Sequence, residues 1–187
     1  MDLFDLDGPD PWRTTDARVV FDNGRMRLHE DLVIQPDGLS GRYAYLEVPV
    51  PIVTVVALDE LLGLYLVRQW RYPWRRNSWE LPSGGGEAQE TALEAAQREL
   101  AEEVGLLASD WQSLGEGYCS ATIDSHWYFF LARQLRETTR HERDSAEHDM
   151  LARRVPLESA VDAAMDGRIQ HGMSVAGILR AARRLGI

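Results

Sequence analysis

The sequence predicts an α/β fold with an N-terminal antiparallel β-hairpin extension, and three observations support it. Two β-rich runs, residues 17–21 and 26–34, flank an Asn-Gly pair, which is a strong hairpin signal. Residues 52–58 are apolar and rich in β-branched side chains, as in a central strand. Residues 87–104 are mostly helix formers, and Gly105 stands where a helix C-cap glycine belongs. Strands and a long helix therefore share one chain.

The N-terminal part divides into a leader and a β-rich extension. Residues 1–16 are acidic and contain two prolines, which is typical of a flexible leader. Residues 17–50 hold the hairpin and a further strand at 43–50, where apolar and polar side chains alternate as on a half-buried surface. We therefore place a domain boundary after residue 50, and residues 51–187 form the main domain.

The main domain alternates between strands and helices. A strand at 64–70 is followed by a loop, and residues 79–82 lead into a glycine turn at 83–86. After the helix we expect two strands with a polar connection, a charged loop, a short strand and two helices. The loop before the turn is 72–77, and the later elements are strands 115–120, 127–132 and 151–155, the connection 121–126, the charged loop 136–149, and helices 157–166 and 174–185.

Composition limits the class of protein. The 187 residues suffice for one domain with a sizeable core, and the formal charge of −10 argues against a nucleic-acid partner. No run approaches about 18 apolar residues, so no membrane span is expected, and the acidic start does not read as a signal peptide. Cys119 is the only cysteine, which excludes an internal disulfide and fits a cytoplasmic location.

Three carboxylates cluster on the long helix. Glu99, Glu102 and Glu103 are spaced i, i+3 and i+4, so they share one face, and Arg98 is the only cation in the local pattern to offset their repulsion. Crowded carboxylates are the oxygen-rich ligand set that Mg²⁺ or Mn²⁺ prefers. The alternative is a solvated acidic face, which is what most glutamate-rich helices present.

The stretch around these carboxylates resembles the Nudix box of the Nudix hydrolases at every specified position. The flanking segments 68–73, 79–82 and 155–185 resemble the ADP-ribose pyrophosphatase-like subfamily. The resemblance implies a Nudix-type α/β/α sandwich around a mixed sheet, so that 51–187 would be the Nudix hydrolase domain. It also implies metal-dependent hydrolysis of a nucleoside diphosphate linked to another group. The box positions are Gly84, Glu90, Arg98-Glu99-Leu100, Glu102-Glu103 and Gly105-Leu106.

The same resemblance implies roles for the box residues. Glu99, Glu103 and the backbone carbonyl of Ser83 would hold Mg²⁺ or Mn²⁺, and Glu102 would serve a second ion as a catalytic residue. Arg98 would orient the carboxylates through charge-assisted hydrogen bonds.

Outside the box, Arg71, Arg68 and Glu80 are the expected substrate-binding residues. Arg71 would hold the diphosphate, because a planar guanidinium matches phosphate oxygens. Within the box, Glu90 is expected to be structural, bridging to Arg98.

The resemblance also implies a general base in the charged loop, where Glu147 is the first candidate. Glu142, His148 and Asp149 are alternatives in the same loop, which could equally be a solvated surface. Asp124 and His126 come next, although a lone histidine more often has no catalytic role.

The expected reaction converts ADP-ribose or a similar nucleoside diphosphate sugar into a nucleoside monophosphate and a sugar phosphate. Alternatives are another substrate such as GDP-mannose, or a non-catalytic nucleotide-sugar sensor, against which the intact carboxylate set argues. Related enzymes usually carry a proline past the box, and this chain has residues 120–126 without one, which leaves the substrate open. Similar enzymes form homodimers through N-terminal strands, so residues 17–50 are the expected contact and Trp12 is a candidate to stack in the partner's site.

Overall fold

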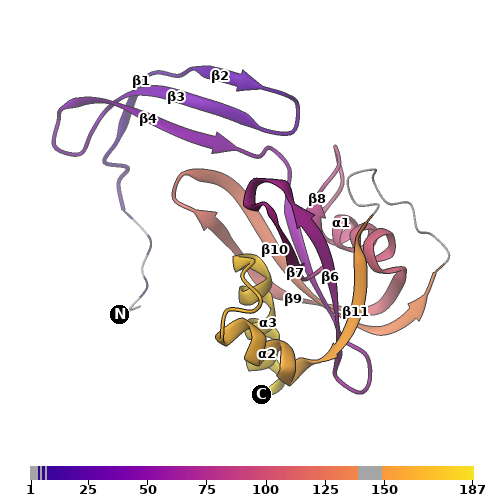
Figure 1. The fold of residues 1–187 in the computed structure, drawn as a ribbon. Coiled ribbons are helices and arrows are strands. Elements are labelled where there is room, and N and C mark those ends of the chain that lie inside the picture. Colours follow the sequence, from indigo (N-terminus) through magenta and orange to yellow (C-terminus); the bar gives the residue numbers. More distant parts are fainter. Residues whose placement is uncertain (1–3, 5, 7, 139–148) are drawn as a thin grey trace. The chain divides into compact units, whose positions relative to one another are not determined.

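The computed structural model describes residues 4, 6, 8–138 and 149–187, which form two compact units (Figure 1). The first unit comprises Met1–Pro49 with Ser120–Asp124, and the second comprises Val50–Cys119 with Ser125–Ile187. The long strand β10 (Ile123–Glu137) contributes residues to both.

Four antiparallel strands build the first unit: β1 (Arg13–Asp16), β2 (Val19–Asp22), β3 (Arg27–Ile34) and β4 (Ser40–Glu47). The predicted β2–β3 hairpin is confirmed, with Gly24 at a φ of 80° in its turn. Asn23 Oδ1 fixes this turn by accepting from the backbone N–H groups of Arg25 and Met26, both at 3.0 Å.

The predicted leader is too long at its C-terminal end. Residues 13–16 were assigned to the leader, whereas they form β1 and pair with β3. Thr15 Oγ1 also donates to the carbonyl of Leu32 at 3.0 Å. Such pairing depends on a partner strand far along the chain, so local composition does not reveal it.

The second unit contains a mixed sheet and an antiparallel one. Strand β5 (Ile52–Ala57) lies between β8 (Ser83–Gly85), which is antiparallel to it, and β10, which is parallel to it; β9 (Leu106–Ser120) pairs with β10. A three-stranded antiparallel sheet places β6 (Gly63–Arg71) between β7 (Arg76–Glu80) and β11 (Leu151–Pro156).

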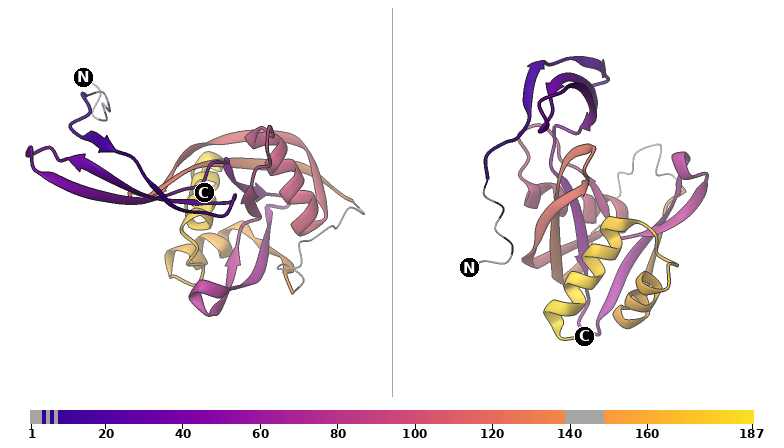
Figure 2. Two further views of the ribbon diagram at one scale, coloured as in Figure 1. Left: turned by 90° about the horizontal axis from the view of Figure 1, so that it is seen from above. Right: turned by 90° about the vertical axis from the view of Figure 1, so that its left-hand side faces the viewer.

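Helices cover both faces of β5, because its side chains alternate between two hydrophobic clusters. Val53 and Val55 pack with Ala96 and Leu100 on the α1 side, whereas Val56 packs with the cluster that contains Ile178. The α-helices among the described residues are α1 (Ala92–Glu99), α2 (Leu157–Met165) and α3 (Gly172–Leu185) (Figure 2). This is the layering expected of an α/β/α sandwich. In the part of the chain that the structure describes, no helix is long and apolar enough to cross a membrane.

Several predicted boundaries shift. The helix predicted from residue 87 begins at Ala92, because Thr91 caps it and forms a capping box with Glu94. The strand predicted at 115–120 is the C-terminal part of the 15-residue strand β9, and the strand predicted at 127–132 is the central part of the 15-residue strand β10. The predicted loop 72–77 is a 3-10 turn, η1 (Tyr72–Trp74), followed directly by β7.

Candidate active site

The candidate site forms where the glycine turn meets the box helix. Strand β8 carries Ser83 and Gly84 alongside β5, and α1 continues into a π-helical turn, η2 (Leu100–Val104), that ends at Gly105 with a φ of 75°. Buried residues of α1 and η2, including Ala96 and Leu100, anchor the helix on β5. The opposite face of the helix is therefore held facing the glycine turn.

Two of the three clustered carboxylates reach the backbone of the glycine turn. Glu103 is fully buried and its Oε2 accepts the N–H of Ser83 at 3.0 Å. The carboxylate of Glu99 occupies the space where a Cβ on Gly84 would stand. Only glycine therefore permits this approach, which explains the residue at position 84.

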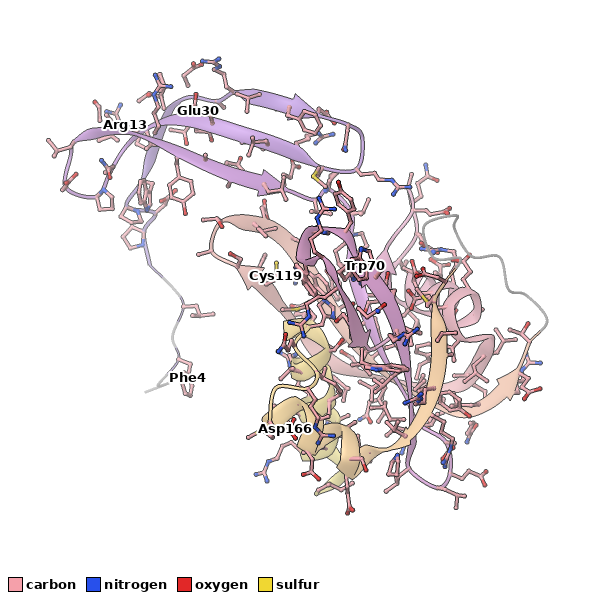
Figure 3. All side chains as sticks on the ribbon, in the orientation of Figure 1. Phe4, Arg13, Glu30, Trp70, Cys119 and Asp166 are labelled. Carbon is pink, nitrogen blue, oxygen red and sulfur yellow. The ribbon has the colours of Figure 1, made fainter. Side chains whose placement is uncertain are left out.

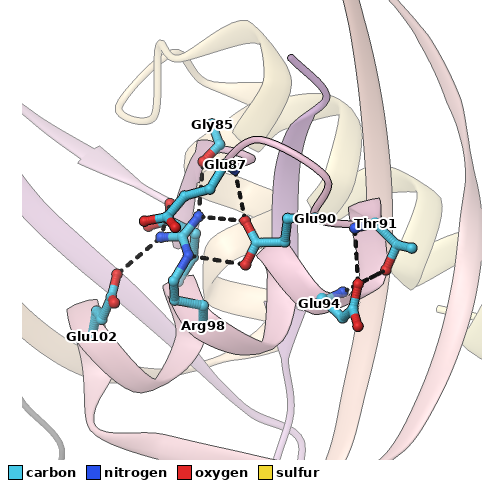
Figure 4. Close-up of polar contacts among 8 residues, drawn as sticks. Gly85, Glu87, Glu90, Thr91, Glu94, Arg98 and Glu102 are labelled. Carbon is cyan, nitrogen blue, oxygen red and sulfur yellow. Dashed lines mark hydrogen bonds and ion pairs between the residues drawn. The ribbon is translucent and has the colours of Figure 1, made fainter.

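Arg98 organises the remaining acidic groups (Figure 4). Its Nε and Nη2 donate to the two oxygens of Glu90 at 3.1 and 3.0 Å, and its Nη1 donates to Glu99 at 2.8 Å and to Glu102 at 3.0 Å. Nη2 also donates to the carbonyl of Gly85 at 2.8 Å. The expected bridge between Glu90 and Arg98 is present.

The electrostatics of this group follow from the same contacts. Burial by itself lowers the pKa of Arg98, but the adjacent carboxylates more than offset it, so the pKa lies above its ordinary value. Burial would raise the pKa of Glu90, whereas its hydrogen bonds from Arg98 and from the backbone of Glu87 lower it overall. Both groups therefore stay charged at neutral pH.

The donor set fits a divalent cation. Three carboxylates, those of Glu90, Glu99 and Glu102, share one guanidinium, and the carboxylate of Glu103 accepts from the turn backbone, so the cluster keeps an excess of negative charge. Within the described ranges, no three acidic, histidine or cysteine side chains converge as a ready metal-ligand group, and Arg98 Nη1 lies within hydrogen-bond distance of both Glu99 and Glu102. Arg98 thus holds two of the expected ligands in place.

Glu80, which is buried, pairs with the partly exposed Arg71. Arg71 Nε donates to Glu80 Oε1 at 2.9 Å and Nη2 donates to Oε2 at 2.5 Å, and the Glu80 side chain is completely buried. Burial would raise the pKa of Glu80, but Arg71 and His171 lower it overall. Glu80, an expected substrate-binding residue, is thus buried and paired with Arg71.

Arg68 and three aromatic residues of the same region lie on β6 and η1. Arg68 is partly buried on β6, opposite Trp79 of β7. Trp70, marked in Figure 3, is exposed at the end of β6, as are Tyr72 and Trp74 of η1. These three rings are therefore not core residues.

The structure describes only some of the candidate general bases. Glu147 lies outside the described residues, as do Glu142 and His148, and Asp149 is exposed. His126 stacks on Tyr118 with ring centroids 5.0 Å apart, and its Nδ1 lies 3.1 Å from the hydroxyl of Tyr128.

Trp12, the candidate for stacking in a partner's site, packs edge-on against Tyr43 of the first unit, with ring centroids 5.4 Å apart, and remains partly exposed.

Sequence reasoning missed His171 and Ser174. His171 is the N-cap residue of α3 but makes no side-chain capping hydrogen bond; its Nδ1 lies 2.8 Å from Ser174 Oγ and 3.3 Å from Glu80 Oε2. No local pattern reveals these contacts, because Glu80 is far away in the sequence.

Comparison with known proteins agrees with this geometry. A family model described as NUDIX domain matches residues 48–174. The ADP-ribose pyrophosphatase of Mycobacterium tuberculosis (strain ATCC 25618 / H37Rv) is 36% identical over 129 residues, which are 68% of this chain and 62% of that protein. An RNA pyrophosphohydrolase of Stenotrophomonas maltophilia (strain K279a) is 42% identical over 84 residues, 42% of this chain and 38% of that protein. These alignments span less than two thirds of either relative.

A solved structure of an ADP compounds hydrolase superposes with a TM-score of 0.84 at 18% identity, and the match covers 96% of this chain and 97% of that one. This likeness confirms the predicted fold class. Because the family model covers more than half of the chain, the family predicted from the box is confirmed as well, and the chain belongs to the NUDIX domain family.

Proposed function

We propose that the chain is a Nudix hydrolase that uses Mg²⁺ or Mn²⁺ to cleave the diphosphate of ADP-ribose or a similar nucleoside diphosphate sugar. The products would be a nucleoside monophosphate and a sugar phosphate. The observation that carries the proposal is the convergence of Glu99 and Glu103 on the Ser83–Gly84 backbone, with Arg98 holding Glu99 and Glu102. The similarity to an ADP-ribose pyrophosphatase supports the choice of substrate.

Each residue has one task in this proposal. Glu99, Glu103 and the Ser83 carbonyl hold a divalent ion, and Glu102 serves a second one. Bound there, such ions neutralise diphosphate oxygens and lower the pKa of water. Arg98 keeps the carboxylates oriented.

Arg71 holds the diphosphate in this proposal. Glu80 accepts from its Nε and Nη2 and so fixes the orientation of the guanidinium. A guanidinium carries five N–H groups in a planar fork, which suits phosphate oxygens.

A substrate screen tests the function. Purified protein with Mg²⁺ would be offered ADP-ribose, GDP-mannose and other nucleoside diphosphate sugars, and released phosphomonoester would be measured. We expect ADP-ribose or a close relative to be turned over fastest, and 5′-triphosphate RNA to be a poor substrate because the chain carries a net charge of −10. Ligand binding without any turnover would instead support the sensor alternative.

Replacing Arg71 with alanine is expected to raise KM with a smaller change in kcat, and also to destabilise the fold. The buried carboxylate of Glu80 would lose its partner, and breaking a buried pair costs up to about 3–5 kcal/mol. Steady-state kinetics and urea unfolding measure the two effects separately. Arg71→Lys should recover only part of the loss.

A paired variant serves as the control for Arg71. Arg71→Ala with Glu80→Gln should regain stability, because no unpaired charge stays buried, yet keep the high KM. An unchanged KM in Arg71→Ala would move the diphosphate contact to Arg68, Arg75 or Arg76.

The proposal includes a homodimer through the first unit and a cytoplasmic location, which the single Cys119 fits. Several large apolar side chains of β2, β3 and their turn are exposed, more than a monomer usually leaves uncovered. They are Val19, Val20, Phe21, Met26, Leu28 and Leu32.

Phe21→Glu is expected to weaken such a dimer at least about tenfold, since burying a phenylalanine contributes about 1.5–3 kcal/mol. Sedimentation equilibrium measures the change. Leu39→Glu, an exposed site in the β3–β4 turn, is the matched control. A wild-type chain that stays monomeric at high micromolar concentration would contradict the proposal.

A further inference from the structure

The Arg71–Glu80 pair has a third member, His171. Glu80 Oε2 accepts from Arg71 Nη2 and also lies 3.3 Å from His171 Nδ1. Because the carboxylate is completely buried, these contacts and its own strand determine where it lies. His171 therefore influences the position of Arg71 through its contact with Glu80.

The first turn of α3 fastens the chain on both sides of Glu80. Ser174 is fully buried, and its Oγ accepts the N–H of Leu81 at 2.8 Å. Three residues later, Gly177 lets α3 approach so closely that a Cβ there would lie 2.7 Å from Leu81 Cδ1. Leu81 in turn leads through Pro82 to Ser83, whose N–H is held by Glu103. One helix turn thus supports both the arginine pair and the start of the glycine turn.

The contacts of His171 select one tautomer. Ser174 Oγ and Glu80 Oε2 both face Nδ1, at 2.8 and 3.3 Å. A proton on Nδ1 is attracted to both oxygens. Without that proton, Nδ1 would be an acceptor that faces the Glu80 carboxylate, which is also an acceptor. Burial lowers the pKa of His171, Glu80 partly opposes this and Arg71 adds to it, so the ring is neutral with a single proton. Glu80 and Arg71 are the charged groups that face the ring.

We propose that His171 is a positioning residue: its Nδ1–H donates to Ser174 Oγ and lies against Glu80 Oε2, 3.3 Å away, and so holds the carboxylate that orients Arg71 toward the diphosphate. This inference rests on the role given to Arg71 in the proposed function. The proposal assigns the effect of His171 to its hydrogen bonding. The ring also packs near Trp74 and Trp127, with ring centroids 6.1 and 6.0 Å away, so the experiments must distinguish hydrogen bonding from packing.

Three substitutions of His171 separate these roles. His171→Asn keeps an N–H donor at the place of Nδ1, whereas His171→Gln puts its donor one bond further and His171→Ala removes it. We expect His171→Ala and His171→Gln to raise KM about tenfold, as loss of an outer supporting contact does, with kcat changed less than about threefold. His171→Asn should keep KM within about threefold of the wild type. An Asn variant as impaired as the Ala variant, or an Ala variant with normal KM, would overturn the proposal.

A double-mutant cycle tests whether the effect passes through Arg71. In an Arg71→Ala background, His171→Ala should leave KM unchanged, because the group that it positions is gone. An undiminished effect in that background would contradict the proposal.

A readout without turnover keeps this inference separate from the proposed function. Nitrogen-15 NMR of the full-length wild-type protein should show His171 protonated on Nδ1, and a slowly exchanging Arg71 Nε–H that exchanges faster in His171→Ala. Those signals in a protein that cleaves no nucleoside diphosphate sugar would refute the proposed function and leave the positioning network standing. Protonation on Nε2 alone would refute the network whatever the activity.

Discussion

Replacing Glu103 with glutamine is expected to lower metal-dependent turnover by at least about 100-fold while the chain stays folded, since even outer contacts of a metal are worth about 10–100-fold. Glutamine has the shape of glutamate and can still accept the N–H of Ser83, so the buried hydrogen bond survives. It also relieves repulsion with Glu99 one turn earlier, an effect of about 0.2–0.5 kcal/mol in exposed helices. Phosphomonoester release under a Mg²⁺ titration, together with urea unfolding, measures both consequences.

Glu94→Gln is the matched control for Glu103→Gln. Glu94 lies on the same helix, is exposed, and serves in the capping box, where glutamine is an accepted substitute. The same loss of one charge should therefore leave turnover and Mg²⁺ dependence unchanged there. Full activity of Glu103→Gln with Mg²⁺ would rule out the assignment of the box carboxylates as metal ligands.

The sequence predicts the box helix well because the relevant contacts are local. Thr91 and Glu94 are three residues apart, and Arg98 meets Glu90, Glu99 and Glu102 within little more than two helical turns. Spacing along one helix fixes which side chains share a face. The approach of Glu99 to Gly84 is already less local, since it depends on how the turn packs on the helix.

Contacts between distant segments could not be predicted in the same way. Arg71 and Glu80 were both expected at the substrate, and the structure shows in addition that Arg71 Nε and Nη2 donate to Glu80 across the β6–β7 pair. Neither residue type reveals the other as its partner. His171 reaches Glu80 only because α3 packs beside the segment at Leu81.

The length of β9 and β10 was missed for a different reason. Residues 106–114 mix apolar and polar side chains without strict alternation, and most are only partly buried. Their strand structure comes from pairing with β10, a partner that is itself mostly half-buried. Pattern methods detect burial on one face, so they find only part of such strands.

The acids placed at the site are poor candidates for the general base. The pKa of Glu80 and that of Glu90 are lowered overall by their arginine partners, although burial opposes the shift. A carboxylate bound to a cation is a weak proton acceptor for the same reason. A base from the charged loop, outside the box, therefore remains the hypothesis.

Glu147→Gln is expected to reduce kcat by about 10²–10⁴-fold with little change in metal affinity, because the general base alone would be lost. Glu142→Gln and His148→Ala, from the same loop, are the matched controls and should keep near-normal kcat under saturating Mg²⁺. Weakened Mg²⁺ binding as the only effect of Glu147→Gln would make Glu147 a metal ligand. Near-normal kcat in all three variants would move the base to Asp124 or to His126, whose ring nitrogens already face Tyr128 and Glu116.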